Sequence, residues 1–197
     1  MSTLNNLAFN TFLLSTRFGA AIPTYDNPAF TIQGLPEWHK LTEEQAAKVN
    51  LAVDRLRVRT LLEEHGIEIK LMTNQLNRIT NQPTNSLSAI LSRTNIGTTV
   101  IALSMNVLNA DIEVIMGVIA HELGHYMTES HHNDLATVIG DKTLQQENIN
   151  HELVADRYAL GLMGNCYIKT LVALAKSNAV YALSKAHKLR LKQAWNY

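Results

Sequence analysis

The strongest constraint on this chain is a pair of histidines, four residues apart, at the end of an apolar segment. His121 and His125 enclose Glu122 in the sequence HELGH, which follows Val, Ile and Ala residues at helical spacing. Residues four apart on an α-helix differ by about 40° in direction, so the two imidazoles share one side and can hold one metal ion. Glu122 is not on the side that the two histidines share, so its carboxylate is free to act on a metal-bound water. The motif therefore predicts a helix with a catalytic zinc site.

A catalytic zinc ion normally takes a third protein ligand, for which the sequence offers two candidates. His131 reproduces the histidine spacing of the elongated metzincin pattern, but Thr128 occupies the glycine position at which that chain turns sharply. Glu152 is the other candidate, and on a helix it shares a face with Asp156. One of these carboxylates can bind zinc while the other accepts a hydrogen bond from a ligating histidine. Ala155, between them, would let the two helices approach closely.

The two motifs together resemble a known family. HELGH at 121–125, followed by Glu152-x-x-Ala-Asp156, is similar to the gluzincin metallopeptidases of the M48 type, which include the CAAX prenyl protease and the heat-shock membrane protease. The resemblance covers roughly residues 65–180. The family's C-terminal His-Pro motif is not matched, because Lys188 follows His187.

This resemblance implies an α+β, zincin-like fold, with a small twisted sheet packed on the motif helix and a mostly helical C-terminal half. It implies one Zn²⁺ per chain, held by His121, His125 and Glu152, with Asp156 orienting a histidine ligand. It also implies an edge strand that pairs with an extended polypeptide substrate. That substrate-binding strand is expected at four residues, Asn85, Ser86, Leu87 and Ser88.

The expected function is that of a zinc-dependent metalloendopeptidase, in which Glu122 acts as general base on water and then protonates the leaving amine. Three alternatives remain open. A repressor-cleaving metallopeptidase of the antirepressor type would act on one regulatory protein. A non-catalytic binding module would keep the zinc ligands without turnover, although a structural site needs no base such as Glu122. A DNA-associated protease is disfavoured by the neutral charge.

Composition limits the partners and the compartment. The 197 residues carry 17 Lys and Arg against 17 Asp and Glu, so the net charge is +0 and no nucleic-acid partner is expected. Polar residues interrupt every apolar run, so no transmembrane segment is expected. The single cysteine, Cys166, indicates a reducing compartment, and its apolar neighbours predict a buried thiol. We therefore expect a soluble cytoplasmic protein.

Helix and turn signals divide the chain into an N-terminal arm or covering segment, residues 1–40, and one metallopeptidase domain, residues 41–197. Thr42 and Gln45 form a capping box that predicts a single long helix up to Gly66. Alternation predicts strands at 67–71, 86–91 and 98–105, with a turn at 95–97. Asn109 is expected to cap the motif helix.

The C-terminal part is expected to be helical from about residue 148, after a polar surface loop at 131–146. Its end carries basic residues that predict a solvated helix face. They are Lys185, Lys188, Arg190 and Lys192.

Overall fold

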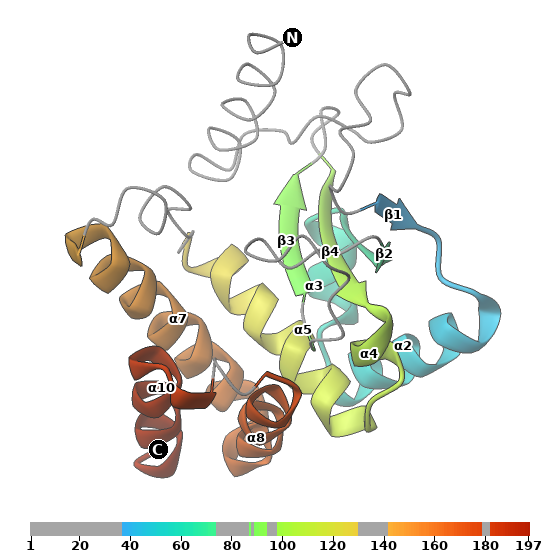
Figure 1. The fold of residues 1–197 in the computed structure, drawn as a ribbon. Coiled ribbons are helices and arrows are strands. Elements are labelled where there is room, and N and C mark those ends of the chain that lie inside the picture. Colours follow the sequence, from blue (N-terminus) through green and yellow to red (C-terminus); the bar gives the residue numbers. More distant parts are fainter. Residues whose placement is uncertain (1–36, 74–86, 88, 94–97, 130–141, 179–181) are drawn as a thin grey trace, which may run out of the picture.

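A four-stranded sheet forms one part of the fold, and helices form the rest (Figure 1). The computed structural model describes residues 37–73, 87, 89–93, 98–129, 142–178 and 182–197. The strand order is β1-β2-β4-β3. The strands are β1 (Glu37–His39), β2 (Ile67–Thr73), β3 (Ala89–Arg93) and β4 (Thr99–Ser104). Only β2 and β4 run parallel to each other, while β1 and β3 pair antiparallel at the two edges. The predicted α+β class is confirmed.

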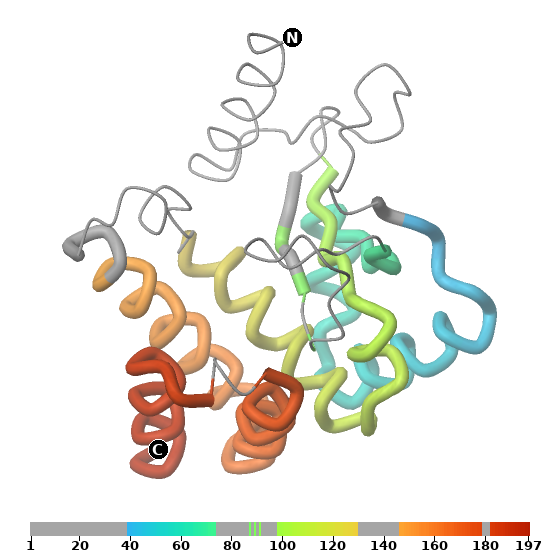
Figure 2. The backbone as a smooth tube through the Cα atoms, viewed as in Figure 1, coloured from blue at the N-terminus to red at the C-terminus, as the bar shows by residue number. Residues whose placement is uncertain are grey.

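Helices account for most of the described residues. In chain order they are α2 (Glu43–Leu56), α3 (Arg59–Glu64), α4 (Met105–Leu108), α5 (Ile112–Met127), α7 (Lys142–Met163), the short 3-10 helix η2 (Gly164–Cys166), α8 (Tyr167–Ser177) and α10 (Lys185–Trp195). The HELGH motif lies at the C-terminal end of α5, which packs against both α7 and α8. Figure 2 shows α10 beside α7, and α10 also packs against α8.

The alternation expected in the sheet is present. Ile67 and Leu71 of β2 are buried, and Ile69 between them packs against the same core. The parallel register places Ile69 beside Ile101 and Leu71 beside Leu103. Because successive side chains of a strand point to opposite faces, these apolar residues form one face of the sheet, covered by helices of the main core.

The first helical region differs from its prediction. The capping box is confirmed, since the Thr42 hydroxyl accepts from Gln45 N and the Gln45 side chain accepts from Thr42 N. The single long helix to Gly66 is wrong. Arg57 takes a left-handed conformation (φ 60°), which ends α2, and α3 begins two residues later. Gly66, also left-handed, comes after the second helix.

The start of the motif helix is also corrected. Asn109 does not cap α5; it ends the short helix α4, whose N-cap is Ser104 at the end of β4. Asp111 is the N-cap of α5, and Glu113 lies in its first turn, where the helix dipole favours a carboxylate. The chain therefore forms one extra turn of helix, α4, between β4 and α5.

Several C-terminal expectations need revision. Helix α7 begins at Lys142, so residues 142–146 of the expected loop are helical. The thiol of Cys166 is exposed, not buried, because the residue lies in η2 at the junction of α7 and α8.

The predicted turn at 95–97 and residues 130–141 lie outside the described residues, as do residues 1–36 of the expected arm. Residues 37–39 of that arm form β1.

One helical stretch within the described residues, Gln146–Ser177, is long and apolar enough to cross a membrane by length and composition alone. A single stretch of this kind is weak evidence, because core helices of soluble proteins pass the same test. The stretch is interrupted at Gly164, which has a φ of 57°. The expected absence of a transmembrane segment stays a prediction.

Helices α5 and α7 approach closely where Gly124 faces Ala155. A Cβ atom built on Gly124 would lie 2.6 Å from the Ala155 carbonyl oxygen and 2.8 Å from its Cα. Ala155 is fully buried, as its predicted role in helix packing requires. Because the obstacle is backbone, α7 would have to move to admit even one methyl group.

We expect Gly124→Ala to lower the free energy of unfolding by about 1–3 kcal/mol, the usual effect of overpacking. Thermal or urea unfolding measures it. Gly161→Ala on α7 is the matched control, since a Cβ atom there meets only the Tyr197 hydroxyl at 3.8 Å. This change should be neutral or stabilise by up to about 1 kcal/mol. Equal effects of the two substitutions would contradict the packing argument.

Candidate metal centre

Three buried or nearly buried side chains bring their donor atoms together at the meeting of α5 and α7. His121 Nε2 lies 3.1 Å from His125 Nε2. Glu152 completes the triangle, with one oxygen 3.4 Å from His121 Nε2 and the other 3.2 Å from His125 Nε2. Ligands of a tetrahedral zinc ion at bond lengths of about 2.1 Å lie about 3.4 Å apart. The three donors are therefore spaced as ligands of one ion, and the cluster could hold a metal.

Asp156 supports His121 from the side opposite the metal position. The Oδ1 atom of Asp156 lies 2.9 Å from His121 Nδ1, so Nδ1–H can donate to it while Nε2 faces the cluster. Asp156 is fully buried. A carboxylate on the second nitrogen fixes the tautomer and ring orientation of a metal-ligating histidine. The contact with His121 is present, and the role of Asp156 in orienting a metal ligand stays a prediction.

Arg190 of α10 contacts two carboxylates of α7, those of Asp156 and Glu152. Its Nε and Nη2 donate to the two oxygens of Asp156, both at 2.7 Å, which is a bidentate pair. Its Nη1 forms an ion pair with Glu152. The Arg190 side chain is buried, so these bonds lie away from water and depend strongly on one another.

The expectation for Arg190 is therefore wrong, since it is not part of a solvated basic face. Lys185, Lys188 and Lys192 recur at i, i+3 and i+7, a spacing that places them on one side of α10. Arg190 falls on the other side, together with the buried His187. The position of Arg190 off the lysine side of the helix was the sequence signal that could have predicted its burial.

Tyr167, at the start of α8, is a second contributor that the sequence does not single out. It is fully buried, and its hydroxyl donates to Asp156 Oδ1 at 2.5 Å. Arg190 Nη2 donates to the same hydroxyl at 3.2 Å. Burial and the nearby Asp156 charge raise the pKa of Tyr167 well above its usual value, so it remains a phenol. Asp156 thus accepts hydrogen bonds from three different helices.

Electrostatics keep this buried cluster charged. Burial alone would raise the pKa of both carboxyls, but Arg190 and His121 hold that of Asp156 at about 2 and that of Glu152 well below its usual range. Burial would lower the pKa of His121, but Glu152 and the hydrogen bond to Asp156 outweigh it and the Arg190 charge, raising that pKa to about 9. Without a metal, His121 therefore holds a proton that a binding cation must displace.

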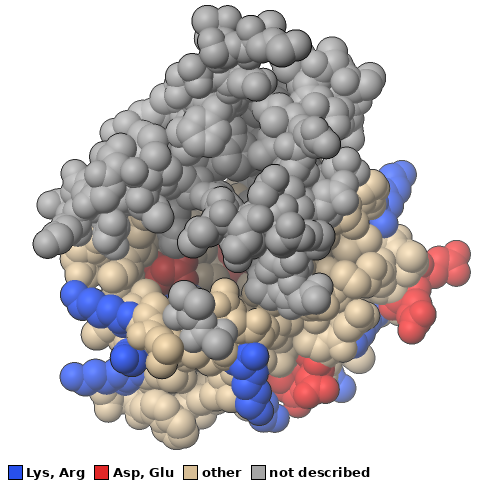
Figure 3. Space-filling view, in the orientation of Figure 1, with Lys and Arg blue, Asp and Glu red and all other residues tan. Residues whose placement is uncertain are grey.

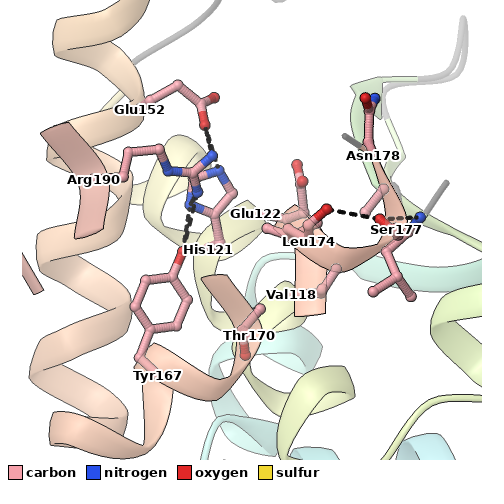
Figure 4. Close-up of a pocket in the computed structure, with 12 residues that line it drawn as sticks. Val118, His121, Glu122, Glu152, Tyr167, Thr170, Leu174, Ser177, Asn178 and Arg190 are labelled. Carbon is pink, nitrogen blue, oxygen red and sulfur yellow. Dashed lines mark hydrogen bonds and ion pairs between the residues drawn. The ribbon is translucent and has the colours of Figure 1, made fainter. Parts of the chain in front are cut away.

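Glu122 stands next to this cluster without belonging to it. Figure 4 shows it between the polar group of Glu152, Arg190 and His121 on one side and Leu174 on the other. It is 8% exposed and lines a pocket of about 280 Å³. On the face shown in Figure 3, one acidic patch is recessed near the centre left, other acidic side chains project at the right and lower right, and Lys and Arg project at the lower left, where α7 and α10 lie.

The structure brings together five of the predicted site residues and leaves others undescribed. His121, Glu122, His125, Glu152 and Asp156 meet as described above. Leu87, expected in the substrate-binding strand, lies before β3, which begins at Ala89, and lines the same pocket as Glu122. Asn85, Ser86 and Ser88 lie outside the described residues, as does the alternative ligand His131.

In comparisons with protein-family models, curated proteins and solved structures, nothing matches this chain.

Proposed function

We propose that this chain is a zinc-dependent metalloendopeptidase. The observation that carries the proposal is the tetrahedral spacing of the His121, His125 and Glu152 donors, with the carboxyl of Glu122 beside them in an open pocket. Among the residues that the structure describes, three side chains are placed as ligands and one position is left over, which is the arrangement of catalytic zinc sites, whereas structural sites are closed by four.

Zinc is the metal that best fits this donor set. Two imidazoles and one carboxylate are ligands that zinc favours, and such sets recur in hydrolytic zinc enzymes. Arg190 balances one of the two carboxylate charges of Glu152 and Asp156, and the proton on His121 balances the other until a bound cation takes its place. A zinc ion would lower the pKa of water to about 7 and polarise a peptide carbonyl.

The residues of the chain have distinct roles in the proposed hydrolysis. Glu122 takes a proton from the attacking water and gives it to the amine that leaves. Asp156 holds the His121 ring in place, and Arg190 with Tyr167 holds Asp156. Strand β3 lies at an edge of the sheet, and Ala89 at its start lines the pocket. An extended polypeptide could pair with that edge as an added strand.

We infer that the fold family is zincin-like, and the resemblance of the two motifs to those of gluzincin peptidases supports this inference. The motif helix α5 beside the edge strand β3 is consistent with this assignment. The antirepressor-type peptidase remains an alternative with the same site. The non-catalytic module is disfavoured because Glu122 lies in a pocket, where a purely structural site needs no carboxyl.

Metal analysis tests the site directly. The purified protein should contain about one zinc ion per chain, and His121→Ala or His125→Ala should lose it, because removal of one of three ligands leaves too little affinity. Cleavage of a peptide library should stop when a chelator removes the metal and return when zinc is added. Full zinc occupancy in both variants would disprove the site.

A second pair of variants separates the two candidates for third ligand. Glu152→Ala should lose zinc, because its oxygens lie within 3.4 Å of both histidine nitrogens. His131→Ala should retain it. The opposite outcome, measured by the same metal analysis, would favour the metzincin arrangement.

A further inference from the structure

We propose that the outer face of α10 binds the surface of an anionic lipid bilayer. This α10 face is defined by Lys185, Lys188, Lys192 and Trp195, and the inference does not depend on the proposed peptidase function. Its basis is the separation of charge along the chain, together with two exposed aromatic side chains at the end of α10.

The zero net charge conceals a difference between two parts of the chain. Residues 142–197 carry eight Lys and Arg against three Asp and Glu, whereas residues 1–141 carry nine against fourteen. Two of the three acids, Glu152 and Asp156, contact Arg190 in the buried centre. Glu147 is the third, and it is exposed. The exposed side chains of this part of the protein therefore carry an excess of positive charge.

Helix geometry gathers the lysines of α10 on one side. Lys185, Lys188, Lys192 and Trp195 follow one another at intervals of three or four residues, so they share one face, and all four are exposed. Lys185 donates a hydrogen bond to the side chain of Gln146, which carries no charge. Figure 3 shows Lys and Arg projecting from the surface that α7 and α10 form. The buried residues of α10 lie on its opposite side, and they are His187, Arg190 and Ala194.

Apolar side chains are exposed at the end of the same face. Trp195 is 71% exposed and Tyr197 is 66% exposed. A Cβ atom built on Gly161 would lie 3.8 Å from the Tyr197 hydroxyl, so the end of the chain lies against the end of α7, where Leu162 is exposed as well. Trp and Tyr favour the boundary between lipid headgroups and acyl chains, because each has an apolar ring and a polar group.

An anionic bilayer suits both the charged and the apolar side chains of this surface. Each Lys or Arg near such a bilayer strengthens binding by about fivefold, and an indole beside the lysines can enter the headgroup layer. Lysine stems can lie on apolar surface while their ammonium groups stay in water. Recognition of nucleic-acid phosphates favours the planar fork of Arg, and Arg157, the exposed arginine of this part, donates to Gln193. The lysines and the aromatic rings together therefore favour lipid.

Sedimentation of the full chain with lipid vesicles tests the proposal. Vesicles of equal parts phosphatidylserine and phosphatidylcholine should bind the protein at least about 10-fold more tightly than vesicles of phosphatidylcholine alone. Lys188→Gln and Lys192→Gln should each weaken binding to the mixed vesicles by about fivefold. Lys40→Gln removes the same charge at an exposed position just after β1, and as the matched control it should leave binding within about twofold.

Tryptophan fluorescence tests the aromatic contribution separately. On the mixed vesicles, the emission of the wild type should shift to shorter wavelength, because Trp195 leaves water. Trp195→Phe keeps the other tryptophan, Trp38, and should lose this shift. Lys188, Lys192 and Trp195 are all exposed, so their substitutions should leave the fold unchanged.

Several outcomes would overturn the inference. They are no binding to vesicles, equal binding to both kinds of vesicle, and equal effects of Lys40→Gln and Lys188→Gln. Tighter binding to an oligonucleotide or to polyglutamate than to the mixed vesicles would also overturn it, because the face would then serve another polyanion. The measurements need neither metal nor turnover, since no candidate ligand lies on the α10 face. Vesicle binding without peptide cleavage would thus support this inference and contradict only the peptidase proposal.

Discussion

Glu122→Gln should abolish peptide cleavage while the protein keeps its fold and its zinc. The amide has the size of the carboxyl group but cannot accept a proton, and general-base catalysis contributes about 10²–10⁴-fold. The three donor atoms come from His121, His125 and Glu152, and none comes from Glu122. The metal content of the variant should therefore be unchanged. Turnover of a library-derived peptide, zinc content and thermal unfolding measure the three quantities together.

Glu113→Gln is the matched control for this experiment. Glu113 lies on the same helix in its first turn, and its side chain is 37% exposed beside Lys169. Its replacement should leave turnover within about twofold, since the Glu113 side chain belongs neither to the metal cluster nor to the pocket lining. Near wild-type cleavage by Glu122→Gln, in a protein that is inactive without metal, would show that Glu122 is not the base.

Arg190→Met should be the most destabilising substitution described here. It leaves Asp156, fully buried, and Glu152 without their shared cation, and breaking one side of a buried charge network costs about 3–5 kcal/mol. Denaturant unfolding of the metal-free protein at neutral pH measures the loss. Lys188→Met, at an exposed position of α10, should change stability by less than about 0.5 kcal/mol.

The effect of Arg190→Met should depend on pH. The folded-state pKa of Asp156 is about 2, below its ordinary value near 4, so the stability it contributes is complete above about pH 4 and is lost as the pH falls towards 2. Arg190 is the largest favourable cause of that low pKa. The difference between wild type and variant should therefore shrink in acid, and a constant difference from pH 7 to 2 would contradict the charge argument.

The clustering of the candidate ligand residues could be predicted because part of their geometry is local. Four-residue spacing places His121 beside His125 and Glu152 beside Asp156 on any α-helix, whatever surrounds them. Only the approach of the two helices depends on tertiary structure, and here Gly124 and Ala155 permit it. The capping box at Thr42 was predictable for the same reason, since both of its hydrogen bonds lie within one turn.

What could not be predicted depends on contacts between distant segments. Arg190 lies in a basic region, and although its spacing sets it apart from the lysines, the sequence does not reveal its two partners, 34 and 38 residues earlier. The end of α2 at Arg57 carries no glycine, and a left-handed arginine is uncommon enough that the helix was expected to continue. Asn109 has a side chain suited to an N-cap, but it lies at the C-terminal end of α4 instead.

The charged residues of the buried centre are synthesised in a fixed order, and Arg190 comes last because α10 follows α5 and α7 in the chain. Both histidines, Glu152 and Asp156 are synthesised before the guanidinium that balances the two acids. Until then the nascent chain holds two carboxylates that can be buried only at a high cost in hydration. Closing of the centre is thus favourable only after α10 is available, and any metal binding at the centre depends on that step.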